Sequence, residues 1–203
     1  MQTFVVGDEY STCGLVKDGK LLVFTDNVAS ISCFNYLPAR NHKLRQWVET
    51  FCAARRLSGI VCIDFIVDSD GTPYAIECNP RASSNLTNFY NNPALGSVLV
   101  NPDTSTGTVQ PLPSAVETCW AFSEAWATVA KAPSLLSLPR RLLGLLHSLT
   151  FKKDAYFDAA DPLPFLALNF IHIPTLLVRN LFTGNRWAKI DPCIGKLTEE
   201  NGD

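Results

Sequence analysis

The chain has 203 residues, of which 47% are hydrophobic and 18% charged, and its formal net charge is −2 at pH 7. This is the composition of a globular protein with enough chain for one domain or one and a half. The nearly balanced charge gives no electrostatic basis for binding nucleic acid or an anionic membrane, so neither is expected as a partner.

The cysteine pattern, the N-terminal sequence and the apolar segments indicate in which compartment the protein is located. Seven cysteines are scattered without a CxxC pair, which is typical of reduced thiols, and the N-terminus MQTFVVGDEYS lacks the pattern of a secretory signal. We therefore expect a cytoplasmic protein. The most apolar stretch, residues 162–178, is uncharged but contains three prolines. Because it is too short for a spanning helix and is interrupted by prolines, we expect a buried segment and no membrane span.

In chain order, residues 2–27 predict two or three strands with a tight turn at Asp18-Gly19. Residues 42–57 predict a helix, and its apolar side chains recur at helical spacing: Leu44, Trp47, Val48 and Phe51. A second hairpin follows over residues 59–79.

Composition divides the chain into three parts. Residues 101–114, NPDTSTGTVQPLPS, have the composition of a linker. We expect residues 1–100 to form an antiparallel sheet packed with helices, and residues 115–203 to form a mainly helical extension. The expected fold class is α+β.

The second hairpin, GIVCIDFIVDSDGTPYAIECNPR, carries its polar side chains on one face. A two-residue turn at Asp70-Gly71 would place Asp64 opposite Glu77. Asn79 and then Arg81 continue the same face at alternate positions. The other face is apolar and is expected to pack inward; its residues are Ile63, Phe65, Val67, Tyr74, Ile76 and Cys78.

Two directly opposed carboxylates destabilise a sheet unless a charge compensates them. The oxygens of Asp64, Glu77 and Asn79 form a hard ligand set that suits Mg²⁺ or Mn²⁺, with substrate phosphates as further ligands. Arg81 alongside could bind a phosphoryl or carboxylate oxygen. The alternative is an edge hairpin whose polar face meets only water.

This hairpin resembles the metal-binding hairpin of the ATP-grasp superfamily. The resemblance implies that Asp64, Glu77 and Asn79 hold Mg²⁺ on the phosphates of ATP, and that Arg81 takes part in catalysis. Upstream, QTFVVGDEYST resembles the hinge of the same family. This implies that Gln2, Phe4 and Val5 line adenine and that Glu9 binds the ribose, although the family often has Glu where this chain has Gln2.

The resemblance covers the C-terminal half of an ATP-grasp fold. It implies that a missing N-terminal lobe, which carries the phosphate loop, is a partner of this chain, and that the chain alone is inactive. The phrases ECNPRASSNLTNFYNNP and DPLPFLALNFIHIPTLLVRN are similar to ATP-grasp ligases of mycosporine-like amino-acid biosynthesis. Those enzymes join an amino acid, usually glycine, to a small-molecule acceptor, 4-deoxygadusol.

On this resemblance, Ser83, Ser84 and Asn88 are candidate substrate contacts, although each could instead cap a helix. Two other functions stay open. One is a different ATP-grasp enzyme, either a carboxylate–amine ligase or a carboxylase. The other is a non-catalytic interaction module.

Overall fold

The computed structural model describes residues 4–29, 35–121, 124–125, 128, 138–183, 189–191 and 196–198. The chain divides into two compact units. The first unit comprises Met1–Ile31 with Tyr36–Glu117, and the second comprises Ser32–Asn35 with Thr118–Asp203. An antiparallel sheet and helices build the chain, so the fold class is α+β, as expected.

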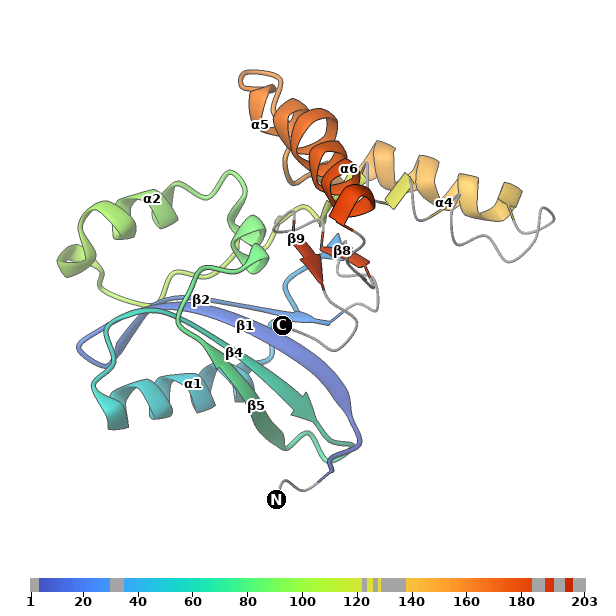
Figure 1. The fold of residues 1–203 in the computed structure, drawn as a ribbon. Coiled ribbons are helices and arrows are strands. Elements are labelled where there is room, and N and C mark those ends of the chain that lie inside the picture. Colours follow the sequence, from blue (N-terminus) through green and yellow to red (C-terminus); the bar gives the residue numbers. More distant parts are fainter. Residues whose placement is uncertain are drawn as a thin grey trace. The chain divides into compact units, whose positions relative to one another are not determined.

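The first unit is built on a four-stranded antiparallel sheet with the strand order β2-β1-β4-β5. The strands are β1 (Asp8–Lys17), β2 (Lys20–Val28), β4 (Gly59–Val67) and β5 (Pro73–Asn79). Helix α1 (His42–Arg55) covers one face of the sheet (Figure 1). The 3-10 helix η1 (Ser84–Phe89) and helix α2 (Pro93–Val100) cover the other face, and β5 forms an edge.

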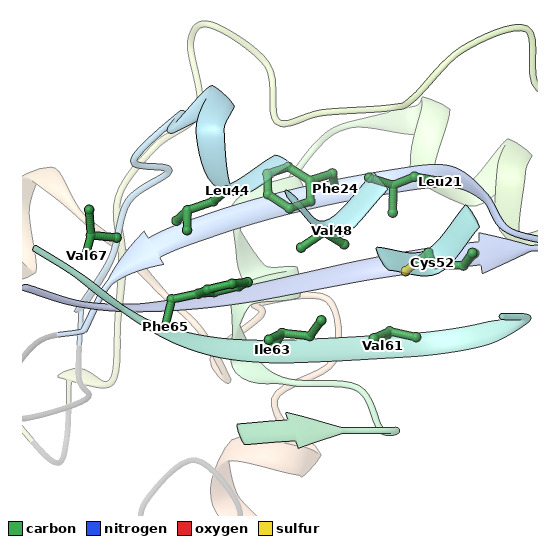
Figure 2. Close-up of a cluster of buried hydrophobic side chains, with 10 residues drawn as sticks. Leu21, Phe24, Leu44, Val48, Cys52, Val61, Ile63, Phe65 and Val67 are labelled. Atoms are coloured by element: carbon green, nitrogen blue, oxygen red, sulfur yellow. The ribbon is translucent and has the colours of Figure 1, made fainter. Parts of the chain in front are cut away.

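The main core lies between α1 and the sheet. The helix begins at Asn41, whose side chain accepts the backbone N–H groups of Lys43 and Leu44. Its buried side chains Leu44, Val48 and Cys52 meet strand residues of β1, β2 and β4 (Figure 2). The β4 residues of this core alternate along the strand: Val61, Ile63, Phe65 and Val67. The helix and its apolar stripe are therefore confirmed.

The turn between β1 and β2 is also confirmed. Lys17 pairs with Lys20, and both Asp18 and Gly19 have positive φ, at 49° and 83°. This is the conformation that a two-residue type I′ turn requires, and it matches the right-handed twist of the strands.

The second hairpin forms with a different turn. The N–H of Gly71 donates to the carbonyl of Asp68 at 2.9 Å, and Gly71 is at φ +75°. The Asp68 carboxylate accepts the N–H groups of Asp70 and Thr72 at 3.0 and 2.8 Å. The loop therefore has three residues, with Gly71 in the left-handed position, and the expected two-residue turn is wrong.

The longer loop changes the register by one residue. Ile66 pairs with Tyr74, where the two-residue turn would have placed Ala75. A bulge at Ile76 then restores the expected pairing farther along β5. Because a shift by one residue reverses the faces, Tyr74 lies on the face opposite to the expected one.

The expectation that the apolar residues of β5 pack inward is wrong as well. Tyr74 is 41% exposed and Ile76 is 47% exposed, and Cys78 is exposed. The reason is that β5 is an edge strand, whereas the buried positions of α1 contact β1, β2 and β4.

The segment 101–114 borders β2. It begins with the 3-10 helix η2 (Pro102–Thr104), after which Val109 pairs with Val23 in a short parallel bridge. The backbone of Val109 donates to Leu22 at 2.8 Å and accepts from Phe24 at 2.9 Å. These bonds hold the segment against the outer edge of β2.

The second unit holds the remaining helices and most of the short strands. The helices are α4 (Leu138–Phe151), α5 (Leu163–Leu166), the π-helical η4 (Ala167–His172) and α6 (Ile173–Thr183). One small sheet has the order β3 (Asn35–Tyr36), β6 (Thr118–Cys119) and β7 (Lys153–Asp154), and another pairs β8 (Lys189–Asp191) with β9 (Lys196–Thr198).

The helical run α5–η4–α6 does not form the buried segment expected over residues 162–178. Its exposed side chains are largely apolar, with Phe170 at 59% and Leu163 at 70%, while Asn169 and Asn180 are buried. Leu163–Phe182 is, by length and composition alone, the one helix of the described residues that could cross a membrane, and 11% of its apolar window is buried. The expected burial is wrong, and the absence of a membrane span stays a prediction.

The turn at Gly19 yields a test of the fold. We expect Gly19→Ala to destabilise the chain by about 1–3 kcal/mol, because φ is +83° there and a new Cβ would lie 3.0 Å from the Cα of Ala53. Gly96→Ala in α2 is the control, since nothing lies within 4 Å of its Cβ position and alanine favours helix. Equal urea midpoints for the two variants would contradict the turn geometry.

Candidate metal site

Asp64 and Glu77 face each other across β4 and β5, which confirms this part of the expected register. Directly opposed residues of antiparallel strands have Cβ atoms about 4.5–5.5 Å apart. Asn79 lies two residues farther along β5, opposite Cys62 and on the same face. Two carboxylates and an amide therefore share the face of the sheet that lies away from α1.

Strand β1 adds two oxygen-bearing side chains to this face. Ser11 pairs with Asp64 from the other side, and its hydroxyl hydrogen-bonds to the Asp64 carboxylate. Glu9 is two residues before Ser11, so it points to the same side of the sheet and is exposed. The structure thus places the candidate ribose ligand Glu9 on the same face as the candidate metal ligands.

The Asp64 carboxyl group is electrostatically disfavoured in its charged form. Burial raises the pKa of Asp64 above its ordinary value, and the negative charge of Glu77 acts in the same direction. The Ser11 hydroxyl and the Arg81 guanidinium act against this rise. Because the pKa is raised in spite of both, these two groups do not offset the effects of burial and of the Glu77 charge on Asp64.

The residues after β5 lie close to this pair. Arg81 is exposed, acts electrostatically on Asp64, and its carbonyl accepts the S–H of Cys62 at 2.9 Å. Ser83 caps η1 by accepting the N–H of Asn85 at 3.4 Å. Ser83 and Ser84 are half-buried, so their roles as substrate contacts stay predictions.

Asn88 is held within the fold. Its side-chain amide is buried and donates to Thr25 at 2.7 Å and to Asn27 at 2.8 Å. These bonds fasten η1 to β2, which fixes the chain that follows the candidate ligands. A substrate contact by Asn88 stays a prediction.

The residues expected to line adenine lie before the first strand. Phe4 is 89% exposed and Val5 is half-buried, while Gln2 lies outside the described residues. Gly7 connects this segment to β1 and approaches the Val67 carbonyl so closely that a side chain would collide with it. Glycine at this position thus lets the segment pass the end of β4.

The donor set fits a hard cation. Among the residues that the structure describes, no three His, Cys, Asp or Glu side chains gather into a metal site. An ion on this face would therefore rest on two carboxylates and the Asn79 amide, all through oxygen, and Mg²⁺ and Mn²⁺ prefer such ligands. Burial and, to a smaller extent, the charge of Glu77 raise the pKa of Asp64, and a bound cation would oppose both effects.

Two features of this face were not foreseen from the sequence. One is Ser11, and the other is a contact between the thiols of Cys13 and Cys62. Alternation along β1 puts Glu9, Ser11 and Cys13 on one side. Their position beside Asp64 depends on the pairing of β1 with β4, for which the sequence carries no local signal.

Comparisons with known proteins gave partial structural likenesses. No family model and no curated protein matches the chain. N5-carboxyaminoimidazole synthetase from Staphylococcus aureus, solved with ADP, matches at a TM-score of 0.34 and 15% identity over 44% of this chain and 27% of that one. L-amino acid ligase from Bacillus licheniformis matches at a TM-score of 0.31 and 20% identity, over 43% of this chain and 25% of that one. The chain spans about a quarter of the length of these two proteins.

The carboxylate pair predicts a gain in stability from removing one charge. We expect Asp64→Asn to raise the melting temperature of the metal-free chain by a few degrees near pH 7, because a disfavoured carboxylate is lost. The folded pKa of Asp64 lies above the unfolded one, so its contribution to stability falls as pH rises through the folded pKa. The gain should therefore vanish below the ordinary pKa of Asp.

Thermal melts from about pH 3 to about pH 8 measure this difference. Asp70→Asn, at an exposed loop position of the same hairpin, is the matched control and should leave the melting temperature nearly unchanged. A gain that is independent of pH, or one that Asp70→Asn reproduces, would contradict the electrostatic account.

Proposed function

We propose that this chain is part of an ATP- and Mg²⁺-dependent ligase of the ATP-grasp type. The observation that carries the proposal is the register that sets Asp64 opposite Glu77 with Asn79 beside them on one face. The raised pKa of Asp64 supports it, since the Ser11 hydroxyl and the Arg81 charge do not offset the effects of burial and of the Glu77 charge. A sheet keeps such a pair at a cost in stability, which a bound cation would offset.

In this proposal Asp64, Glu77 and Asn79 hold Mg²⁺ or Mn²⁺ against the phosphates of ATP. When bound, the cation neutralises charge that develops on the transferred phosphoryl group. Glu9, on the same face, binds the ribose, while Gln2, Phe4 and Val5 contact adenine. As a partner of this chain, an N-terminal ATP-grasp lobe would supply the other wall of the nucleotide site.

The proposed reaction is phosphorylation of an acceptor oxygen, followed by displacement of phosphate by an amine. Arg81 would bind the transferred phosphoryl group or the acceptor oxygen, because its guanidinium is exposed and close enough to act on Asp64. Ser83 and Ser84, where the chain leaves β5, would contact the acceptor. Within this class we propose glycine as the amine and 4-deoxygadusol as the acceptor; another carboxylate–amine ligase or a carboxylase would use the same metal face.

A second candidate is a non-catalytic interaction module. Many large apolar side chains of the second unit are exposed, among them Leu143 at 67%, Leu146 at 59% and Phe151 at 68%. Exposed apolar surface of this kind is typical of a surface that binds a partner. Such a module would bind its partner without a metal, so metal binding separates the two candidates.

The metal role predicts the outcome of a Mn²⁺ titration. We expect the chain to bind Mn²⁺ more tightly in the presence of ATP, because the phosphates complete the ligand shell. Glu77→Gln should weaken that binding by more than about tenfold, since the amide cannot supply a carboxylate charge. Electron paramagnetic resonance of free Mn²⁺ measures binding directly and requires no turnover.

Asp70→Asn is again the matched control and should bind Mn²⁺ as the unchanged chain does. The circular dichroism spectrum of Glu77→Gln should stay that of the unchanged chain, because Glu77 is exposed on an edge strand. If Glu77→Gln folds and binds Mn²⁺ with unchanged affinity, the ligand role of Glu77 is wrong.

A further inference from the structure

Two cysteine side chains meet on the same face as the carboxylate pair. Cys13 of β1 and Cys62 of β4 are 0% and 3% exposed, and their side chains are close enough for each to affect the pKa of the other. Their strands are in register on both sides, through the pairs Ser11–Asp64 and Gly14–Val61. The two thiols are therefore cross-strand neighbours, with Thr25 beside Cys13 and Asn79 beside Cys62.

The register of the flanking pairs brings the two cysteines to opposed positions. Disulfides span Cα separations of about 4.4–6.8 Å, and opposed residues of a regular antiparallel ladder lie about 4.5–5.5 Å apart. The ladder of β1 and β4 is interrupted at the cysteines, since its pairs skip from Ser11–Asp64 to Gly14–Val61. Between the two flanking pairs, the Thr12 hydroxyl donates to the Ile63 carbonyl at 2.8 Å and accepts its N–H at 3.3 Å. A side chain thus bridges β1 and β4 next to the thiols.

The two thiols differ in the direction of their pKa shifts. The Cys62 side chain lowers the pKa of Cys13 to about 7, against the opposing effect of burial, and Ser83 contributes through its backbone and hydroxyl. The same contact raises the pKa of Cys62. By contrast, burial raises the pKa of Cys52 to about 11. The thiolate is the nucleophilic form of cysteine, so a lowered pKa favours Cys13 over Cys62 as the thiol that reacts first.

A single short segment covers the pair. Cys62 donates its S–H to the Arg81 carbonyl at 2.9 Å, and Ser83 hydrogen-bonds to Cys13. Arg81 and Ala82 are exposed and Ser83 is half-buried. In the proposal that follows, a small oxidant would reach the sulfurs by a movement of this segment, which contacts both of them.

We propose that Cys13 and Cys62 are a redox modification site that forms a reversible disulfide when a hydroperoxide oxidises the chain. The Cys13 thiolate attacks one peroxide oxygen, which breaks the O–O bond, yields a sulfenic acid and releases hydroxide. The Cys62 sulfur then attacks the Cys13 sulfur, and the sulfenic oxygen leaves as water with the Cys62 proton. Two thiols lose two electrons, and one molecule of hydrogen peroxide becomes two of water.

The link would change the segment that follows β5. A disulfide removes the S–H that Cys62 donates to Arg81, and it removes the thiolate that accepts from Ser83. Residues 81–86 would lose both of these hydrogen bonds to the sheet. Their amide hydrogens would therefore exchange faster with solvent. This inference stands on the thiol geometry and is independent of the proposed ligase function.

Peptide mapping tests the proposal on the whole chain. The reduced chain is treated with hydrogen peroxide at neutral pH, its remaining thiols are blocked with N-ethylmaleimide, and a tryptic digest is analysed without reductant. We expect a peptide pair that links Cys13 to Cys62, weighs two hydrogens less than the reduced peptides, and separates on adding dithiothreitol.

Cys78→Ser is the matched variant. Cys62 and Cys78 lie in one tryptic peptide, since no Lys or Arg occurs from Leu57 to Pro80, so the variant makes the link to Cys62 unambiguous. It should keep the link and the faster exchange of residues 81–86, whereas Cys13→Ser should lose both. In the unchanged chain, the exposed Cys78 also reports that oxidant was present. Recovery of Cys13 and Cys62 as maleimide adducts after Cys78 is fully oxidised would overturn the proposal, as would links from either to other cysteines.

Discussion

The alternation of side chains along β4 is the constraint on which the site depends. Ile63 and Phe65 are among the most buried side chains of the first unit, and they point toward α1. Because successive residues of a strand point to opposite faces, Asp64 between them must point away from α1. Turning Asp64 inward would remove both neighbours from the core, at about 1.5–3 kcal/mol for each side chain. The apolar core therefore fixes the direction of the carboxylate.

The position of Glu77 depends on two shifts of the β4–β5 register that have opposite directions and cancel. The three-residue loop at Ser69–Gly71 shifts the register by one residue, and the unpaired Ile76 shifts it back. Either change alone would turn Glu77 to the face that α1 covers, away from Asp64. The Asp68 carboxylate stabilises the first irregularity through two backbone N–H groups. The facing carboxylates thus depend on a side chain and a bulge that lie outside the candidate site.

The parts of the fold with local signals could be predicted, and those that depend on distant contacts could not. The turn at Asp18-Gly19 and the apolar stripe of α1 follow from dipeptide chemistry and helical spacing, and both form. The facing of Asp64 and Glu77 was also predicted, but from a turn that does not form, and only the bulge at Ile76 makes the outcome agree. Apolar content predicted burial over residues 162–178, but burial requires a covering surface that composition does not encode.

The two faces of the sheet differ in what they contribute. Under α1, apolar side chains pack together and stabilise the fold. On the other face, cross-strand neighbours of like kind meet: the carboxylates Asp64 and Glu77, and the thiols Cys13 and Cys62. The two carboxylates repel each other, and each thiol alters the ionisation of the other. Groups that lower stability at positions fixed by the register are typical of functional surfaces, where a ligand or a reaction supplies the missing compensation. The core under α1 and the apolar cluster under η1 and α2 provide the stability that allows the rest of the opposite face to carry such chemistry.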